Sequence, residues 1–130
     1  MLSVWFVALG SAAGGVTRYL LSGAVQRAAG GPFPAGTLLV NVSGSFLLGF
    51  LLRYTLAVPA VTPELRLGLT AGFCGGYTTF STFSAETVTL VEGGDYRRAA
   101  LYALTSLVVS ILAAALGFAA ARALTAGGVD

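Results

Sequence analysis

The chain contains no histidine and no lysine, and its one cysteine, Cys74, lies inside an apolar run. A single cysteine cannot build a disulfide framework within the chain. Without histidine, the sequence also lacks the commonest zinc ligand and the cysteine–histidine pair of a thiol enzyme. These absences argue against a metalloenzyme or a cysteine-dependent catalyst, and we expect no enzymatic activity.

Charged residues are also scarce: they make up 9% of the 130 residues, whereas 56% are hydrophobic, and the mean hydropathy is +0.87. A soluble domain carries about 25% charged residues, and a chain this short would need that polar coat to stay in solution. The seven basic residues, all arginine, are scattered and form no surface for a nucleic acid. The composition therefore predicts an integral membrane protein, surrounded by membrane lipid and with no nucleic-acid partner.

Four apolar stretches are long enough to cross a bilayer, whose core of about 30 Å needs about 20 helical residues. They run approximately over residues 2–25, 36–57, 65–91 and 97–124. Glycines and prolines at 30–34, prolines at 59 and 63, and a polar turn at 92–95 separate them. We therefore predict an all-α integral membrane protein in which residues 1–130 form a single domain of four transmembrane helices. The short connections predict an up-down-up-down, multi-pass bundle in the inner (plasma) membrane of the cell, with both termini on one side.

Glycines recur at intervals of four residues in two of these stretches, at Gly10 and Gly14 and at Gly68, Gly72 and Gly76. Small residues at this spacing allow helix backbones to approach closely in lipid, where packing drives helix association. We expect the first and third stretches to pack tightly. The alternative is that glycine is simply frequent here, at 18 of 130 residues.

The arginines at the ends of the stretches do not favour one orientation in the membrane. The side that holds the N-terminus has three and the other side has four: Arg53, Arg66 and Arg122 against Arg27, Arg97, Arg98 and, if it reaches outward, Arg18. Orientation follows the count of Lys and Arg in short loops, and three against four is almost no bias. Both orientations could insert and pair as an antiparallel, dual-topology homodimer, although so few charges can also be balanced by chance.

Paired glycines and a run of hydroxyl residues interrupt the third stretch, at Gly75–Gly76 and over residues 78–84. Glycine weakens a helix, and hydroxyl groups can satisfy the backbone groups that a break frees. We predict a break at Gly75–Gly76, close to residue 78, the midpoint of 65–91. Carbonyls of residues 75–78 could then meet their symmetry mates on the two-fold axis of an antiparallel dimer and hold a cation. The alternative is a continuous glycine-rich helix whose hydroxyls bond back to their own turns.

Polar residues on the other stretches indicate an ion path. Asn41 lies near the membrane centre, and at 100° per residue it shares a face with Thr37, Gly44 and Ser45. Ser106 and Ser110 are one turn apart in the fourth stretch. Arg18, in the last third of the first stretch, is a candidate for attracting an anion, because ionisable residues in a membrane are usually functional. So near a helix end, it could equally serve as an anchor.

The inventory of these groups favours an anion as the permeating ion. Amide and hydroxyl groups donate hydrogen bonds, and the edges of the Phe80 and Phe83 rings carry positive charge from the ring quadrupole. Glu86 is the only carboxylate well inside a stretch, and it faces away from the two phenylalanines. This scarcity of carboxylates argues against a proton-coupled carrier of cations.

Three segments of the chain resemble the Fluc (CrcB) family of fluoride channels. They cover the first three stretches in order: residues 14–19 (GGVTRY), 36–46 (GTLLVNVSGSF) and 72–84 (GFCGGYTTFSTFS). The last segment is highly specific. The fourth stretch matches only in the placement of Tyr102, Ser106 and Ser110, and the family often has alanine where Val16 and Thr17 stand here.

The resemblance implies a dual-topology homodimer with two fluoride pores and a central structural sodium ion. Backbone carbonyls of Gly75 and Thr78 from both copies would hold the sodium. Asn41, Phe80 and Phe83 would line the pore. Further polar groups would support them: Thr37, Ser81, Thr82, Ser84, Ser106 and Ser110.

Two other classes of protein compete with this interpretation. A small proton-coupled multidrug exporter is also a four-helix, often antiparallel protein, but it needs a carboxylate in its first helix, where this chain carries Arg18. A tetraspan assembly protein without transport activity could be as rich in glycine, but it would not need a polar break at the membrane centre.

Overall fold

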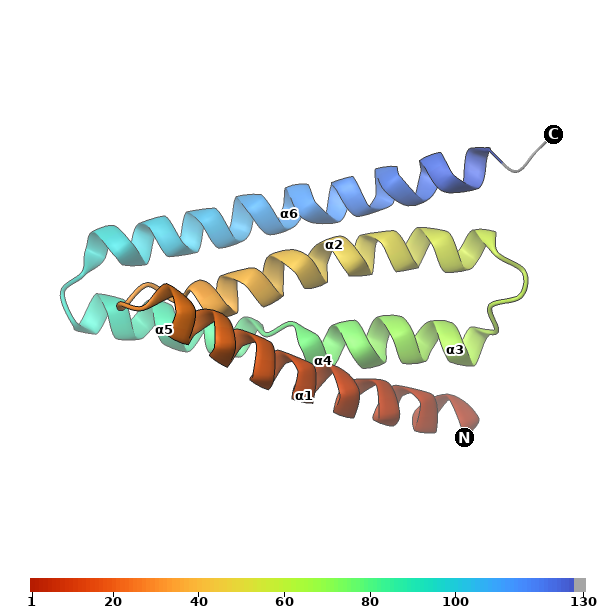
Figure 1. The fold of residues 1–130 in the computed structure, drawn as a ribbon, viewed down its shortest axis with the longest axis horizontal. Helices are drawn as coiled ribbons and strands as arrows, with labels where there is room; N and C mark the ends of the chain where they lie inside the picture. The colour runs from red at the N-terminus through yellow and green to blue at the C-terminus, as the bar shows by residue number, and fades with distance from the viewer. Residues whose placement is uncertain (128–130) are drawn as a thin grey trace.

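Over residues 1–127, which the structure describes, the computed structural model is an antiparallel bundle of helices without a strand (Figure 1). Three helices are long and continuous: α1 (Leu2–Ala29), α2 (Ala35–Ala57) and α6 (Tyr96–Ala126). Each is long and apolar enough to cross a membrane. α1 begins and α6 ends at the same end of the bundle, as the short connections predict.

The third pass is built from several pieces. It begins with α3 (Pro63–Leu67), continues as the π-helix η1 (Gly68–Cys74) and the short α4 (Gly75–Tyr77), and ends with α5 (Phe80–Glu92). Thr78 and Thr79, between α4 and α5, have extended backbone, with φ of −92° and −152°. Together with α1, α2 and α6 this broken helix completes the four passes that the sequence predicts.

The break lies later in the chain than we predicted. Gly75 has helical dihedrals (φ −63°, ψ −38°), and Gly75 and Gly76 both belong to α4. The helix opens at Thr78–Thr79, because Asn41 of α2 binds the backbone of Thr79 there. The prediction of a break near residue 78 is confirmed, whereas its placement at the glycine pair is wrong.

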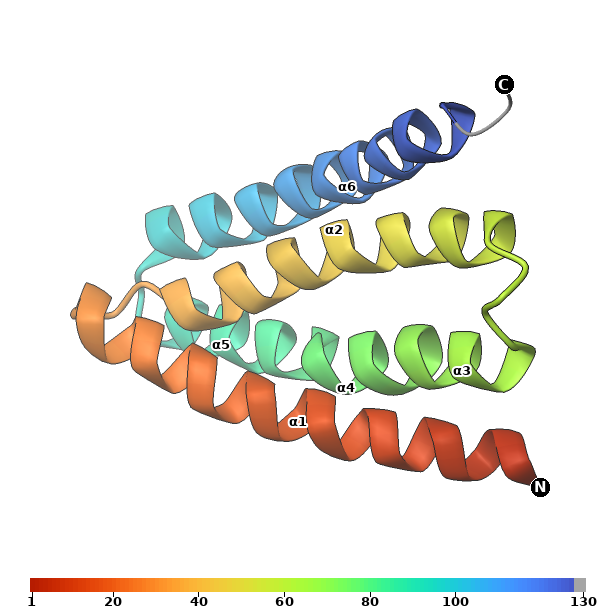
Figure 2. The same cartoon turned by 45° about the vertical axis from the view of Figure 1, so that its right-hand side comes forward.

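α1 lies along the broken helix (Figure 2), and several glycines lie where the two backbones touch. A Cβ added to Gly10 would clash with the backbone of Gly68, and one added to Gly14 would clash with the backbone of Phe73. A Cβ on Gly76 would meet the Ser11 carbonyl of α1. The predicted close packing of the first and third passes is therefore confirmed, and it presses α1 against the segment that precedes the break.

The outer surface of the bundle is apolar, as lipid requires. Large side chains such as Trp5, Leu20, Leu104 and Leu116 are more than half exposed, whereas the buried residues are mostly small. Tyr102 is the largest fully buried side chain. It packs against Phe33 and Phe83, with ring centroids 5.7 Å and 5.3 Å apart.

Polar side chains close the two connections at the end opposite the termini. Gln26 of α1 donates to the carbonyls of Gly31 and Phe33 and accepts from the Gly36 N–H, which ties the turn between α1 and α2. Asp95 caps the N-terminus of α6 by accepting from the Arg98 N–H at 3.2 Å. This backbone hydrogen bond and the Arg98 guanidinium hold the pKa of Asp95 below its usual value.

Candidate functional site

At the break, side chains take over backbone hydrogen bonds that a continuous helix would make. The Thr79 N–H, which would bind the Gly75 carbonyl, donates instead to Oδ1 of Asn41 at 2.7 Å. Nδ2 of Asn41 donates to the Thr79 carbonyl at 3.0 Å, so one amide holds both sides of this residue. The Thr82 N–H, which would bind the Thr78 carbonyl, donates to the Thr79 hydroxyl at 3.1 Å. The Gly75 and Thr78 carbonyls thereby lose their helical donors.

A third carbonyl at the break, that of Gly76, is bound from α1. Its helical donor would be the N–H of Phe80, but Phe80 belongs to α5, beyond the extended residues. Nε of Arg18 donates to the Gly76 carbonyl instead, at 3.0 Å. Among residues 1–127 the one salt bridge joins Arg98 to Asp95, so Arg18 has no carboxylate partner in the described part of the chain.

The face of the break that carries Gly75 is open. Gly75 is exposed, and a Cβ built on it would have no atom within 4 Å. No cluster of three or more His, Cys, Asp or Glu residues occurs in the described part of the chain, so backbone and hydroxyl oxygens are the cation ligands available there. Carbonyl oxygens suit a hard cation such as sodium, and the residues at the break therefore fit the sodium that the resemblance implies.

A cavity of about 540 Å³ lies beside the break, between α2, α5 and α6. It brings together six of the residues that the sequence singled out: Asn41, Thr78, Phe80, Phe83, Ser106 and Ser110. Thr79 also reaches it, and Leu48, Leu104 and Leu107 contribute apolar wall. The Phe80 and Phe83 rings lie 5.4 Å apart on the α5 side. Their role in conduction stays a prediction, but their grouping in space is now observed.

Ser106 gives this cavity an unused hydrogen-bond donor. Its side chain is 7% exposed, and its hydroxyl has no partner among the described residues. A buried hydroxyl without a partner costs free energy, so this donor is available to a water or an ion that enters the cavity. Asn41 adds a second donor, because its amide has two N–H hydrogens and Thr79 takes one of them.

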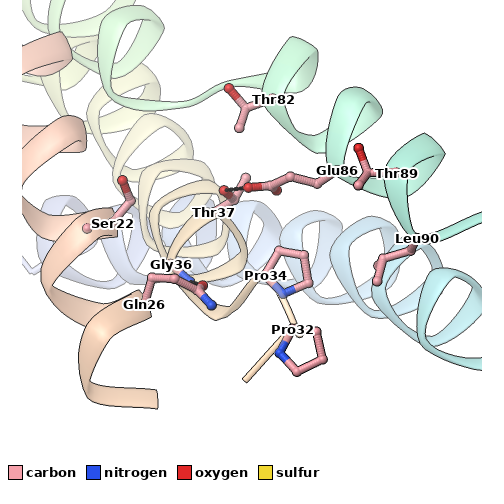
Figure 3. Close-up of a pocket in the computed structure, with 11 residues that line it drawn as sticks. Ser22, Gln26, Pro32, Pro34, Gly36, Thr37, Thr82, Glu86, Thr89 and Leu90 are labelled. Carbon is pink, nitrogen blue, oxygen red and sulfur yellow. Dashed lines mark hydrogen bonds between the residues drawn. The ribbon is translucent and has the colours of Figure 1, made fainter. Parts of the chain in front are cut away.

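A second cavity, of about 470 Å³, lies nearer the end of the bundle that carries the two polar connections (Figure 3). Thr37, Thr82 and Glu86 line it, together with Gln26 and Ser22 of α1. Glu86 projects across it toward α2, where its Oε1 accepts a hydrogen bond from Thr37 at 2.8 Å. Its Oε2 accepts from the Tyr102 hydroxyl at 2.6 Å.

Glu86 and Tyr102 link the two cavities. Glu86 lines the outer cavity, and Tyr102 contacts Phe83, which lines the cavity beside the break. Phe83 and Glu86 lie three residues apart on α5, about one turn, and they line different cavities. A continuous series of polar and aromatic groups therefore runs from the membrane centre to one end of the bundle.

Two of the predicted supporting residues lie outside both cavities. Ser84 donates to the Phe80 carbonyl of its own helix at 2.9 Å, and the Ser81 hydroxyl pairs with that of Thr79 at 3.2 Å. Both bonds are local, so in one copy of the chain these hydroxyls stabilise the first turns of α5. Thr37 and Thr82 belong to the outer cavity rather than to the one beside the break.

Sequence reasoning did not name Glu86 or Tyr102 as site residues. Glu86 had a signal, since it is the only carboxylate well inside a pass and such residues are functional candidates. Tyr102 had no such signal beyond its place in the fourth stretch, one turn before Ser106. Gln26 was also missed, because its three hydrogen bonds depend on a turn whose course the sequence does not reveal.

The four passes, the broken helix and the two cavities between them define a small multi-pass membrane protein with polar side chains in its interior. Comparison with known families agrees with this class. The chain belongs to the CrcB family: the model of the CrcB-like protein, Camphor Resistance (CrcB), matches residues 5–118.

Curated relatives named fluoride-specific ion channel FluC are similar over nearly the whole chain. The relative from Geobacter sulfurreducens is 47% identical over 124 residues, 95% of this chain and 100% of that protein. The relative from Pelobacter propionicus is 48% identical over 128 residues, 98% of this chain and 99% of that protein. The relative from Anaeromyxobacter dehalogenans is 52% identical over 115 residues, 88% and 90% of the two chains.

Proposed function

We propose that this protein is a fluoride-selective ion channel of the inner membrane, which lets fluoride leave the cell passively. The observation that carries the proposal is the cavity beside the break, where the buried Ser106 hydroxyl and the Asn41 amide offer donors next to Phe80 and Phe83. The FluC name of the relatives supplies the identity of the ion. As a channel, the protein catalyses no reaction.

Fluoride must exchange a strong hydration shell for protein donors, and a narrow path excludes larger anions such as chloride. Ser106, Ser110 and Asn41 provide N–H and O–H donors at the membrane centre. The positive edges of Phe80 and Phe83 can face an anion without binding it tightly. Farther along, fluoride would compete with Glu86 for the hydroxyls of Thr37 and Tyr102, which now donate to its carboxylate.

The functional unit in this proposal is an antiparallel homodimer. Phe80 is 79% exposed in a single copy although it lies next to the break at the membrane centre. Irregular backbone at that depth must be covered by protein or line a wet cavity. A second copy related by a two-fold axis in the membrane plane would cover it and would give two equivalent pores.

A structural sodium ion at the centre of the dimer completes the proposal. The Gly75 and Thr78 carbonyls of each copy would hold it, since both lack their helical donors. The ion would satisfy these carbonyls and join the two copies by positive charge. No side-chain carboxylate is needed, which agrees with the lack of an acidic cluster among residues 1–127.

Fluoride efflux from liposomes that contain the purified protein tests this function. We expect rapid efflux of fluoride when potassium leaves with it through an added ionophore, and no comparable efflux of chloride. A proton-coupled drug exporter would instead respond to an imposed pH gradient and to a cationic drug. A tetraspan assembly protein would leave both ions inside, and either result would refute the channel.

A further inference from the structure

We infer that Arg18 is a positioning residue that binds the Gly76 carbonyl and so directs the Gly75 and Thr78 carbonyls to the cation. The inference deepens the proposed function and rests on its sodium site. Arg18 was a candidate for attracting anions in the sequence, but its Nε is 3.0 Å from the Gly76 carbonyl oxygen.

The break separates the carbonyls of residues 75–78 from the donors of a continuous helix, and those of Gly75, Gly76 and Thr78 do not have the same fate. Asn41 and Thr79 take the N–H groups that would serve Gly75 and Thr78. The Gly76 carbonyl is bound by Arg18. α1 thus satisfies this carbonyl, whereas those of Gly75 and Thr78 remain available as ligands.

α1 is held firmly enough at this point to fix a carbonyl. Gly14 lies one turn before Arg18, and its backbone approaches that of Phe73 and Tyr77 so closely that a Cβ would clash there. Gly76 meets the backbone of Ser11 and Gly15 in the same way. α1 and α4 therefore lie side by side at the break (Figure 2), and the reach of Arg18 is set by the packing of one backbone on the other.

The bond fixes the guanidinium through one of its nitrogens. Arg18 is half-buried, and Nε, one of the three guanidinium nitrogens, donates to a carbonyl of the chain rather than to an anion. A charged donor to a carbonyl contributes more than a neutral one. Without it, the Gly76 carbonyl would have to turn toward another partner and would draw the adjacent Gly75 peptide with it.

Two substitutions test whether Arg18 positions the Gly76 carbonyl or attracts the permeating anion. In Arg18→Gln, the Nε2 donor stands the same number of bonds from Cα as the arginine Nε, so the donor is kept and the charge is lost. In Arg18→Met, the side chain keeps this length but loses both donor and charge. The melting temperature of the purified protein is measured in sodium and in potassium for wild type and both variants, alongside fluoride efflux from liposomes.

We expect wild type and Arg18→Gln to melt at a higher temperature in sodium than in potassium. Arg18→Met should lose this difference and conduct fluoride roughly tenfold more slowly or worse, the effect of losing a charge-assisted bond at a half-buried carbonyl. If Arg18→Met keeps the sodium-dependent difference of wild type, the inference is wrong. Equal loss of efflux in both variants with an unchanged sodium effect would assign Arg18 to attraction of the anion and would equally overturn it.

The sodium site itself is judged on wild type alone: if wild-type melting does not depend on sodium, the proposed ion fails, whatever the variants do. If Arg18→Met does not fold, Arg18→Gln alone still tests the positioning role. Its uncharged amide keeps the hydrogen-bond donor, so melting should still occur at a higher temperature in sodium than in potassium. Loss of that effect in a folded Arg18→Gln would contradict the positioning role.

Discussion

Individual side chains at the membrane centre replace what regular secondary structure would supply. Asn41 supplies a donor and an acceptor to a single residue, Thr79, and thereby makes an extended peptide tolerable in the middle of a pass. Thr79 in turn caps α5 through its hydroxyl. In hydrocarbon each unsatisfied backbone group costs several kcal/mol, so this amide has a structural role besides any contact with the ion.

Replacement of Asn41 by alanine should therefore weaken both structure and conduction. Loss of the two hydrogen bonds to Thr79 leaves buried backbone groups without partners and should lower the free energy of unfolding by about 1–3 kcal/mol. Fluoride efflux should fall strongly, because the cavity loses a donor as well as its wall. Chemical denaturation in detergent and liposome efflux measure the two effects. Thr17→Ala, which removes only an exposed hydroxyl bonded to its own helix, is the control. Near-normal efflux in Asn41→Ala would remove this residue from the pore.

The hydroxyl of Tyr102 offers a second test at this scale. Tyr102→Phe keeps the fully buried ring but removes the 2.6 Å hydrogen bond to Glu86. A hydrogen bond to a charged group contributes about 1.5–3 kcal/mol, so we expect a loss of that size in stability together with slower fluoride efflux. Tyr19→Phe, at a position 77% exposed, should change neither quantity. Unchanged stability of Tyr102→Phe would mean that Glu86 is satisfied without this bond.

Among the elements, the third pass differs most from a regular helix. Its first half contains a π-helix of seven residues, an uncommon form that is frequent near functional sites. The π-helix lies against α1 through Gly10, Gly68 and Gly72, so its irregular turns face another backbone rather than lipid. α1 thus supports the segment that leads into the break.

Substitution of a glycine where these backbones meet should separate α1 from the broken helix. A Cβ at position 14 would clash with the Phe73 carbonyl, and overpacking of this kind costs about 1–3 kcal/mol. Gly14→Ala should therefore lower stability and efflux. Gly15→Ala is a close control on the same helix, because a Cβ there has no neighbour within 4 Å. Equal stability of the two variants would show that α1 can move away from Phe73 at little cost.

The four passes could be predicted from the sequence more completely than the irregular segments within them. Apolar length and the Gly–Pro breakers predicted all four passes to within a few residues of their ends. The break was placed three residues early, because glycine is a local signal, whereas the amide that opens the helix comes from another pass. The link between Glu86 and Tyr102 joins two passes, and no spacing rule within one helix reveals it.

At the scale of the whole molecule, one copy of the chain leaves the face beside the break uncovered. The exposed Gly75 face and the 79% exposed Phe80 lie at the depth where polar backbone most needs cover. The arginines are distributed almost evenly between the two ends, so neither orientation is strongly favoured. Both facts are explained together if two copies insert in opposite orientations and meet at their breaks.

The orientation of the chain in the membrane can be changed by removing arginine charges at one end of the bundle, without altering the break. Arg27→Gln with Arg97→Gln leaves the N-terminal side more basic, and Arg53→Gln with Arg122→Gln leaves the opposite side more basic. Because basic ends stay in the cytoplasm, each double variant should insert mostly one way round. Impermeant maleimide labelling of a cysteine introduced at position 60, with Cys74→Ser, should detect this, while the otherwise unchanged protein is labelled from both faces.

Each double variant alone should lose most fluoride efflux from cells, since it lacks an inverted partner, and co-expression of the two double variants should restore it. Full efflux from a variant that inserts in a single orientation would exclude the antiparallel dimer, and so would labelling of the otherwise unchanged protein from one face only.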